Sequence, residues 1–79
     1  MPERTDWEAK ARGLLRAEMA RQQVTYAQLV EKLATFGIKE DERNLRNKVS
    51  RGKFTAAFLL ACLEALGCRT LILKDLSQG

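Results

Sequence analysis

The chain has 79 residues, of which 46% are hydrophobic and 30% are charged, and its formal net charge is +4. This length allows a single domain, and the composition excludes an intrinsically disordered chain. No apolar run approaches the roughly 18 residues of a membrane-spanning helix, and the first residues lack the apolar stretch of a signal peptide. We therefore expect a cytoplasmic protein without a membrane partner.

Catalytic chemistry has little support in this sequence. The chain has no histidine, which is the commonest general base and metal ligand. Its two cysteines, Cys62 and Cys68, cannot complete a four-ligand zinc site within one chain, and we expect reduced, partly buried thiols. Neither a glycine-rich phosphate loop nor a pair of carboxylates at catalytic spacing is present. The sequence predicts a protein that is not an enzyme and that holds no cofactor or metal.

The first predicted helix covers residues 6–22. A capping box, Thr5-x-x-Glu8, is expected to begin it, because the threonine side chain can accept a backbone hydrogen bond while the glutamate reaches back. Apolar residues follow at helical spacing and give the helix one apolar face. They are Trp7, Ala11, Leu14, Leu15 and Met19. Trp7 is expected to anchor the core.

Two shorter helices are predicted next. The second begins at another capping box, Thr25-x-x-Gln28, and ends at Gly37. The third follows the acidic residues 40–42, which suit the positive end of a helix dipole, and runs to about residue 51, just before a glycine. Its only apolar residues are Leu45 and Val49, so one narrow edge of this helix is expected to touch the core.

The fourth predicted helix runs from about residue 55 to residue 66 and ends at Gly67. Only Glu64 is charged in this helix. It is therefore predicted to be either the central helix of the core or a central helix that also presents a face to a second subunit. Residues 69–73 are β-prone and could form a strand or a clipped terminal helix. These elements predict an all-α fold, a compact bundle of four to five helices with a helix-turn-helix core, in which residues 69–73 add either a short C-terminal strand or a clipped helix. They form one domain, residues 1–79, with an ordered core of about residues 6–73.

Basic residues concentrate in the third helix. The segment 43–53 holds five basic residues and no acidic one, whereas the rest of the chain has 9 basic and 10 acidic residues. With the two apolar residues turned inward, Arg43, Asn47 and Arg51 fall on one outward stripe. Arginine can bridge a guanine and asparagine an adenine in the major groove. The pattern predicts a surface that binds double-stranded DNA.

Two sets of DNA contacts are expected. Base edges are predicted to be contacted by Arg43, Asn44 and Asn47. Phosphates are predicted to be contacted by Thr25, Gln28, Arg46, Lys48, Arg51 and Lys53. The acidic residues 40–42 support the alternative that these cations pair internally and that the helix is only a solvated face.

The sequence resembles the Cro/λ-repressor-like family at residues 25–33 (TYAQLVEKL), at Gly37-Ile38, at residues 50–52, and from Phe54 through the apolar helix to Gly67. The resemblance covers about residues 24–67 and implies a third helix in the major groove. It also implies a core that contains Leu29, Leu33, Ile38, Val49, Phe58 and Leu66. The segment 33–49 is several residues longer than that family usually has. Residues 26–29, 47–54 and 63–68 also resemble a group of short bacterial proteins labelled only as of unknown function.

The rival interpretation is a protein-interaction module that keeps the fold without binding DNA, because fold does not imply function. Surplus apolar surface would then form a homodimer through Phe58, Leu59, Leu63, Leu71, Ile72 and Leu73. Binding to phosphates would weaken steeply with salt, whereas an apolar contact would respond little. RNA remains an alternative ligand, and under the DNA interpretation the expected process is regulation of transcription.

Overall fold

The computed structural model describes residues 6–71, and residues 1–5 and 72–79 lie outside that description. The described chain forms four α-helices, in agreement with the predicted all-α class. α1 spans Trp7–Gln22, α2 spans Tyr26–Ala34, α3 spans Glu42–Arg51 and α4 spans Ala56–Ala65. No strand occurs between residues 6 and 71. None of the four helices is long and apolar enough to cross a membrane.

The helices begin at side-chain caps. Thr25 and Gln28 form the predicted capping box of α2, with Thr25 Oγ1 accepting from the Gln28 amide at 3.1 Å and Gln28 Oε1 accepting from the Thr25 amide at 2.9 Å. The predicted cap of α1 is wrong, because Asp6 takes this position and accepts from the Ala9 amide at 3.1 Å. Aspartate caps at least as well as threonine and adds a negative charge at the positive end of the helix dipole.

Glycines end the turns that follow α2 and α3. Gly37 has a φ of 81°, and the amide of Ile38 donates to the carbonyl of Leu33 at 3.1 Å. The Gly37 amide donates to the carbonyl of Ala34 at 3.0 Å, which completes a Schellman motif. Gly52 caps α3 with a φ of 69°. Both predicted glycine stops are therefore confirmed.

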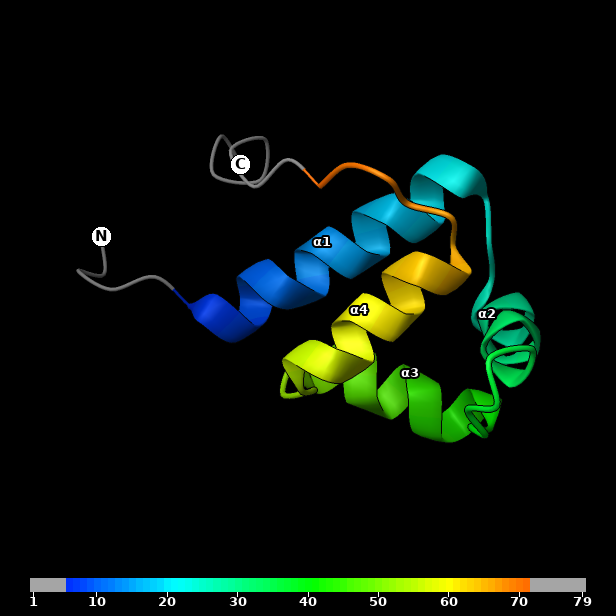
Figure 1. Cartoon of the computed structure of the whole chain (residues 1–79). Helices are drawn as coiled ribbons and strands as arrows, with labels where there is room; N and C mark the ends of the chain where they lie inside the picture. Colours follow the sequence, from blue (N-terminus) through cyan, green and yellow to red (C-terminus); the bar gives the residue numbers. More distant parts are fainter. Residues whose placement is uncertain (1–5, 72–79) are drawn as a thin grey trace.

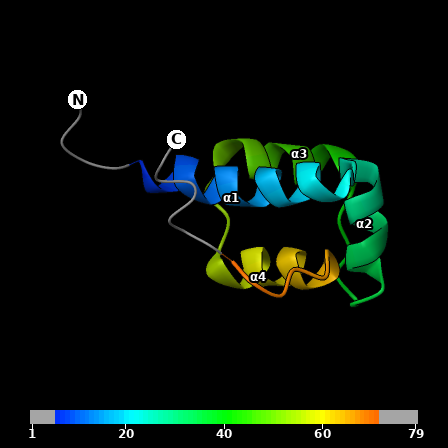
Figure 2. The same ribbon diagram turned by 90° about the horizontal axis from the view of Figure 1, so that it is seen from above.

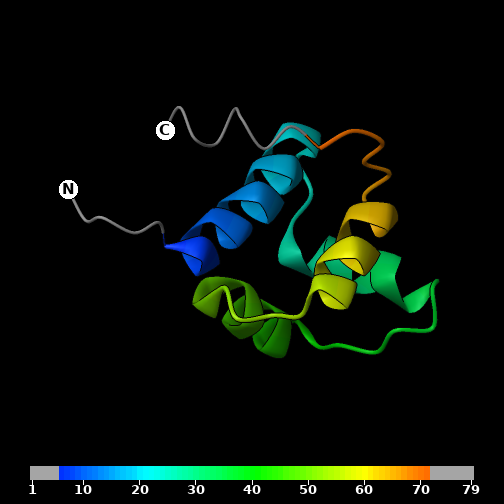
Figure 3. The same ribbon diagram turned by 60° about the vertical axis from the view of Figure 1, so that its left-hand side comes forward.

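The four helices enclose one core. α1 and α2 each pack against both α3 and α4. In Figure 1, α2 lies across one end of the molecule, and Figure 2 shows α1 and α3 along one side with α4 on the other. The connection between α2 and α3, residues 35–41, runs along the outside of the molecule (Figure 3). α3 consequently keeps a side that no other helix covers.

Each helix contributes buried side chains to this core. Leu45 and Val49 are the buried residues of α3, as predicted, and both are fully buried. Ile38 and Phe58, which the family resemblance places in the core, are half-buried and pack against it. The buried cluster consists of Leu15, Met19, Leu29, Leu33, Leu45, Val49, Cys62, Leu63 and Leu66.

Trp7 does not anchor the core, contrary to the prediction. Its side chain is 69% exposed. It lies in the first turn of α1, which extends beyond the ends of α3 and α4 (Figure 2). Lys10 Nζ instead lies 5.4 Å from the centroid of the Trp7 ring, in a cation–π contact on the surface of the helix.

α4 packs on one side of the core and is not its central helix. Its inner face buries Cys62 and Leu63, whereas Leu60 on the opposite face is 64% exposed. An apolar sequence alone does not reveal this difference, because both faces of the helix carry leucines. Beyond α4, residues 69–71 form neither the strand nor the helix considered for them, and residues 72 and 73 lie outside the described chain.

The junction between α1 and the end of α3 depends on Gly52. A Cβ atom added there would lie 2.4 Å from the carbonyl oxygen of Glu8, and the φ of 69° disfavours any side chain. We expect Gly52→Ala to lower the free energy of unfolding by about 2–4 kcal/mol, because a steric clash adds to the cost of the left-handed conformation. Urea unfolding measures this loss.

Gly37→Ala is the matched control for this prediction. Gly37 also has a positive φ, 81°, but nothing lies within 4 Å of an added Cβ atom. Its substitution should therefore cost only the backbone strain, about 1–2 kcal/mol. Equal losses in the two variants would contradict the steric role of the Glu8 carbonyl.

Candidate nucleic-acid interface

The side of α3 opposite the core is polar and open. Leu45 and Val49 point inward, so Arg43, Asn47 and Arg51 lie together on the outward side, one helical turn apart. All three are exposed, and within residues 6–71 their side chains have no hydrogen-bond or ion-pair partner. The structure therefore brings together the outward stripe that the sequence predicts and leaves its polar groups available.

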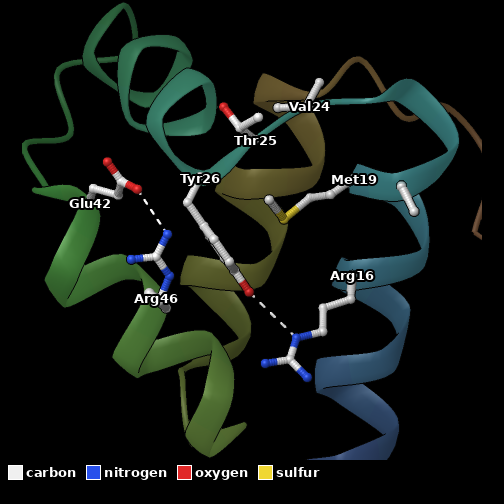
Figure 4. A pocket seen from close by; sticks show the side chains of 8 residues that line it. Arg16, Met19, Val24, Thr25, Tyr26, Glu42 and Arg46 are labelled. Atoms are coloured by element: carbon white, nitrogen blue, oxygen red, sulfur yellow. Dashed lines mark hydrogen bonds and ion pairs between the residues drawn. The ribbon is translucent and has the colours of Figure 1, made fainter.

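One flank of α3 faces α1 and α2. Arg46 Nη2 forms an ion pair with Glu42 Oε2 at 2.8 Å. The guanidinium carbon of Arg46 also lies 5.2 Å from the centroid of the Tyr26 ring, and Figure 4 shows the two groups next to each other. Arg46, which is predicted to contact a phosphate, thus has an internal partner while its side chain stays half-exposed.

The other flank of α3 faces α4. Lys48 Nζ forms an ion pair with Glu40 and lies 4.7 Å from the centroid of the Phe58 ring. The side chain of Glu40 is only 10% exposed. Removing Lys48 from this pair would leave a largely buried carboxylate without its cation, so Lys48 is held more firmly than Arg46.

Asn44 is engaged at the start of α3. Asp41 caps the helix by accepting from the Asn44 amide at 2.8 Å, and its second oxygen accepts from Asn44 Nδ2 at 3.1 Å. The acidic residues 40–42 therefore pair with Asn44, Arg46 and Lys48, as the alternative interpretation expects for this part of the helix. They do not pair with the outward stripe.

Two arginines of α1 extend the polar surface and were not predicted. Arg12 Nη1 donates to the carbonyl oxygen of Ser50 at 3.0 Å, and Arg16 Nη2 donates to Ser50 Oγ at 3.2 Å. Because Ser50 adjoins Arg51 in α3, these contacts place two further guanidinium groups at the edge of the outward stripe. Their i, i+4 spacing on the polar side of the first helix is the only signal in the sequence that could have indicated them.

The remaining predicted phosphate contacts lie near opposite ends of α3. Thr25 lines the same pocket as Arg46, beside the start of α3, and the capping box uses Thr25 Oγ1 and Gln28 Oε1 as acceptors, not as the donors that a phosphate needs. Lys53 follows the end of α3, is exposed, and has its Nζ 4.0 Å from Glu8 Oε2. The predicted cations are therefore distributed along the whole length of the helix.

The cysteines are free thiols with different surroundings. Cys62 is buried and Cys68 is half-buried. Burial raises the pKa of the Cys62 thiol to about 12, and the negative charge of Glu40 adds to the rise while Lys48 opposes it. At neutral pH, Cys62 is protonated and behaves as a small apolar side chain. Within residues 6–71, no three histidine, cysteine, aspartate or glutamate residues gather where they could hold a metal ion.

The apolar residues predicted for a homodimer do not share one exposed surface. Leu63 is 6% exposed and lies in the core, so it cannot contact a second subunit without leaving the core. Phe58 and Leu59 are half-buried against the core, and Leu71 is exposed. Ile72 and Leu73 lie outside the described chain.

The sequence that forms α3 and the helices around it matches a recognised sequence family. A family model described as a domain of unknown function, DUF6471, matches residues 7–71. The chain belongs to the DUF6471 family. The match covers all four helices of the domain, and so includes both α1 and the outward stripe of α3. No curated protein and no solved structure matches the chain, so the function of this DUF6471 domain must be argued from its own residues.

Proposed function

We propose that this DUF6471 domain binds double-stranded DNA and catalyses no reaction, with α2 and α3 acting as a helix-turn-helix that places α3 in the major groove. The observation that carries the proposal is the outward stripe, where Arg43, Asn47 and Arg51 are exposed and have no internal partner among residues 6–71. The resemblance of residues 24–67 to the Cro/λ-repressor-like family supports it. Regulation of transcription is the process that the proposal implies.

Arg43 and Asn47 have the chemistry for contacts with bases. A guanidinium group can donate to O6 and N7 of guanine, and a carboxamide can bridge N6 and N7 of adenine. Arg43 lies in the first turn of α3 and Asn47 lies one turn later, where recognition helices approach base edges. The Asn44 amide group would first have to leave Asp41, so the proposed base contacts rest on Arg43 and Asn47.

Cations beside the stripe and at the end of α3 suit the phosphates of the DNA backbone. Arg46 and Arg16 lie on one side, Arg51 lies at the end of α3, and Lys53 lies beyond it. The half-exposed ion pair between Arg46 and Glu42 is an arrangement that contributes little to stability, so a phosphate can replace the carboxylate at small cost. Lys48 is the weakest candidate in this group because its partner, Glu40, is largely buried.

A protein-interaction module is the second candidate function. The observation that favours it is the outer face of α4, where Leu60 is 64% exposed and Ala56 and Ala57 are exposed beside it. A second copy of the chain could cover this face around a two-fold axis. Such a contact would be apolar and would respond weakly to salt.

Titration of a random-sequence duplex at several salt concentrations tests the proposed function. We expect the logarithm of the affinity to fall linearly with the logarithm of the salt concentration, with a slope of about −4 to −5 if about five cations contact phosphates. Amide chemical-shift changes should map to residues 43–53 and to Arg12 and Arg16, the two residues of α1 that bond to Ser50. Absence of binding at low salt would contradict the proposal and favour the interaction module.

A further inference from the structure

An open pocket of about 520 Å³ lies where the second half of α1 meets the beginnings of α2 and α3. This volume is within the range of small-molecule sites. Figure 4 shows Tyr26 between Arg46 on the α3 side and Arg16 on the α1 side. We call this hollow the Tyr26 pocket, and its lining includes Arg16, Met19, Val24, Tyr26, Glu42 and Arg46.

The lining of the Tyr26 pocket carries a net positive charge, because it contains two guanidinium groups and one carboxylate. Arg46 bonds to Glu42 through Nη2, whereas Arg16 uses Nε on the Tyr26 hydroxyl at 3.4 Å and Nη2 on Ser50. A guanidinium group has five N–H donors, so both arginines keep donors that no residue within 6–71 occupies. An anionic ligand suits these donors.

The pocket also presents apolar surface. Met19 and Val24 contribute apolar groups, and Tyr26 adds an aromatic ring against which Arg46 already lies. A bare inorganic anion would leave this surface uncovered. A neutral apolar molecule would remove water from the guanidinium groups without giving them an acceptor, which is costly. The lining therefore matches a molecule that combines both parts.

We propose that the Tyr26 pocket binds a small organic anion. Its carboxylate, sulfonate or phosphate group would accept from the donors that Arg16 and Arg46 keep on either side of Tyr26, and its aromatic or branched apolar group would lie against Met19 and Val24. A phosphate of DNA supplies only the anionic part and fits this site less completely. Because Arg46 belongs to α3 and Arg16 bonds to Ser50, the bound molecule contacts the helix that carries the outward stripe.

Binding of anilinonaphthalene sulfonate, a fluorescent aromatic anion, to the folded chain in the absence of DNA tests this proposal. We expect saturable binding, with amide chemical-shift changes centred on residues 16–26 and 42–46. Arg16→Gln and Arg46→Gln should each weaken the affinity by at least about tenfold, because each variant loses a charge-assisted hydrogen bond to the sulfonate. Arg43→Gln is the matched control, since it removes the same charge from α3 outside the pocket and should leave the affinity nearly unchanged.

Four results would overturn the proposal. The first three are unchanged affinity in both pocket variants, equally tight binding of phenylnaphthylamine, which has the same rings without the sulfonate, and chemical-shift changes centred on α4. Displacement of the dye by an equal concentration of inorganic phosphate would also overturn it, because the site would then accept a bare anion. Arg16→Lys keeps the positive charge and should therefore bind the dye more tightly than Arg16→Gln does. It replaces Arg16→Gln in the test if that variant does not fold. The dye-binding measurements contain no DNA, so their results do not depend on whether the domain binds DNA.

Discussion

We expect Asn47→Ala to weaken binding to the preferred duplex by roughly tenfold to a hundredfold, because the variant loses a bidentate contact to an adenine. Binding to random-sequence duplex should change much less, since the carboxamide group is neutral and contributes little to the attraction between the domain and phosphates. The preferred duplex is first selected from a randomised library. Fluorescence anisotropy at one fixed salt concentration then measures both affinities for the wild-type chain and the variant.

Lys53→Ala is the control for this contrast. Lys53 lies beyond α3 and is exposed, so it is expected to contact a phosphate and to carry no sequence information. Its loss should weaken binding to both duplexes by a similar factor and make the salt dependence shallower by about one unit of slope. Equal losses on both duplexes in Asn47→Ala would contradict the assignment of Asn47 to a base.

These two positions give a clear comparison because neither substitution disturbs the core. Asn47 has no internal side-chain partner among residues 6–71, and Lys53 only approaches Glu8 at 4.0 Å. Arg46→Ala would be harder to interpret, because it would also remove the ion pair with Glu42 and the contact with the Tyr26 ring. A change in DNA affinity would then mix a lost contact with a displaced flank of α3.

Local signals predicted the helices well because each signal acts within a few residues. Thr25 and Gln28 satisfy each other's backbone amides, and Gly52 adopts the left-handed conformation that ends α3. The spacing of Leu45 and Val49 was sufficient to identify the buried edge of α3 and therefore its outward stripe. These features follow from backbone geometry and helical periodicity alone.

Contacts between helices could not be predicted in the same way. Lys48 pairs with Glu40 eight positions earlier, and Arg16 bonds to Ser50 across 34 positions. Both contacts depend on how α1, α3 and the connection at residues 35–41 are placed in space. The exposure of Trp7 has the same origin, because a sequence does not show that a helix extends beyond its neighbours. Free and paired cations were therefore distinguishable only in the folded chain.

Leu45→Ala is expected to lower the free energy of unfolding by about 2–5 kcal/mol. Leu45 is fully buried in the cluster that all four helices share, and its removal leaves a cavity beneath α3 as well as losing apolar burial. Leu45 and Val49 are the two buried residues that α3 contributes to the core. The substitution should therefore loosen the helix that presents Arg43 and Asn47. Urea unfolding monitored by circular dichroism measures the loss.

Leu60→Ala provides the same chemical change on a surface. Leu60 is 64% exposed on α4, so its truncation in a monomer should cost less than about 1 kcal/mol. Similar losses at both positions, independent of protein concentration, would contradict the placement of Leu45 in the core and Leu60 outside it. A loss at Leu60 that shrinks as the protein is diluted would instead mean that a second copy covers α4, because dilution dissociates a dimer and removes the contribution of its interface. The pair of variants thus tests the position of α3 and the rival interaction surface in one experiment.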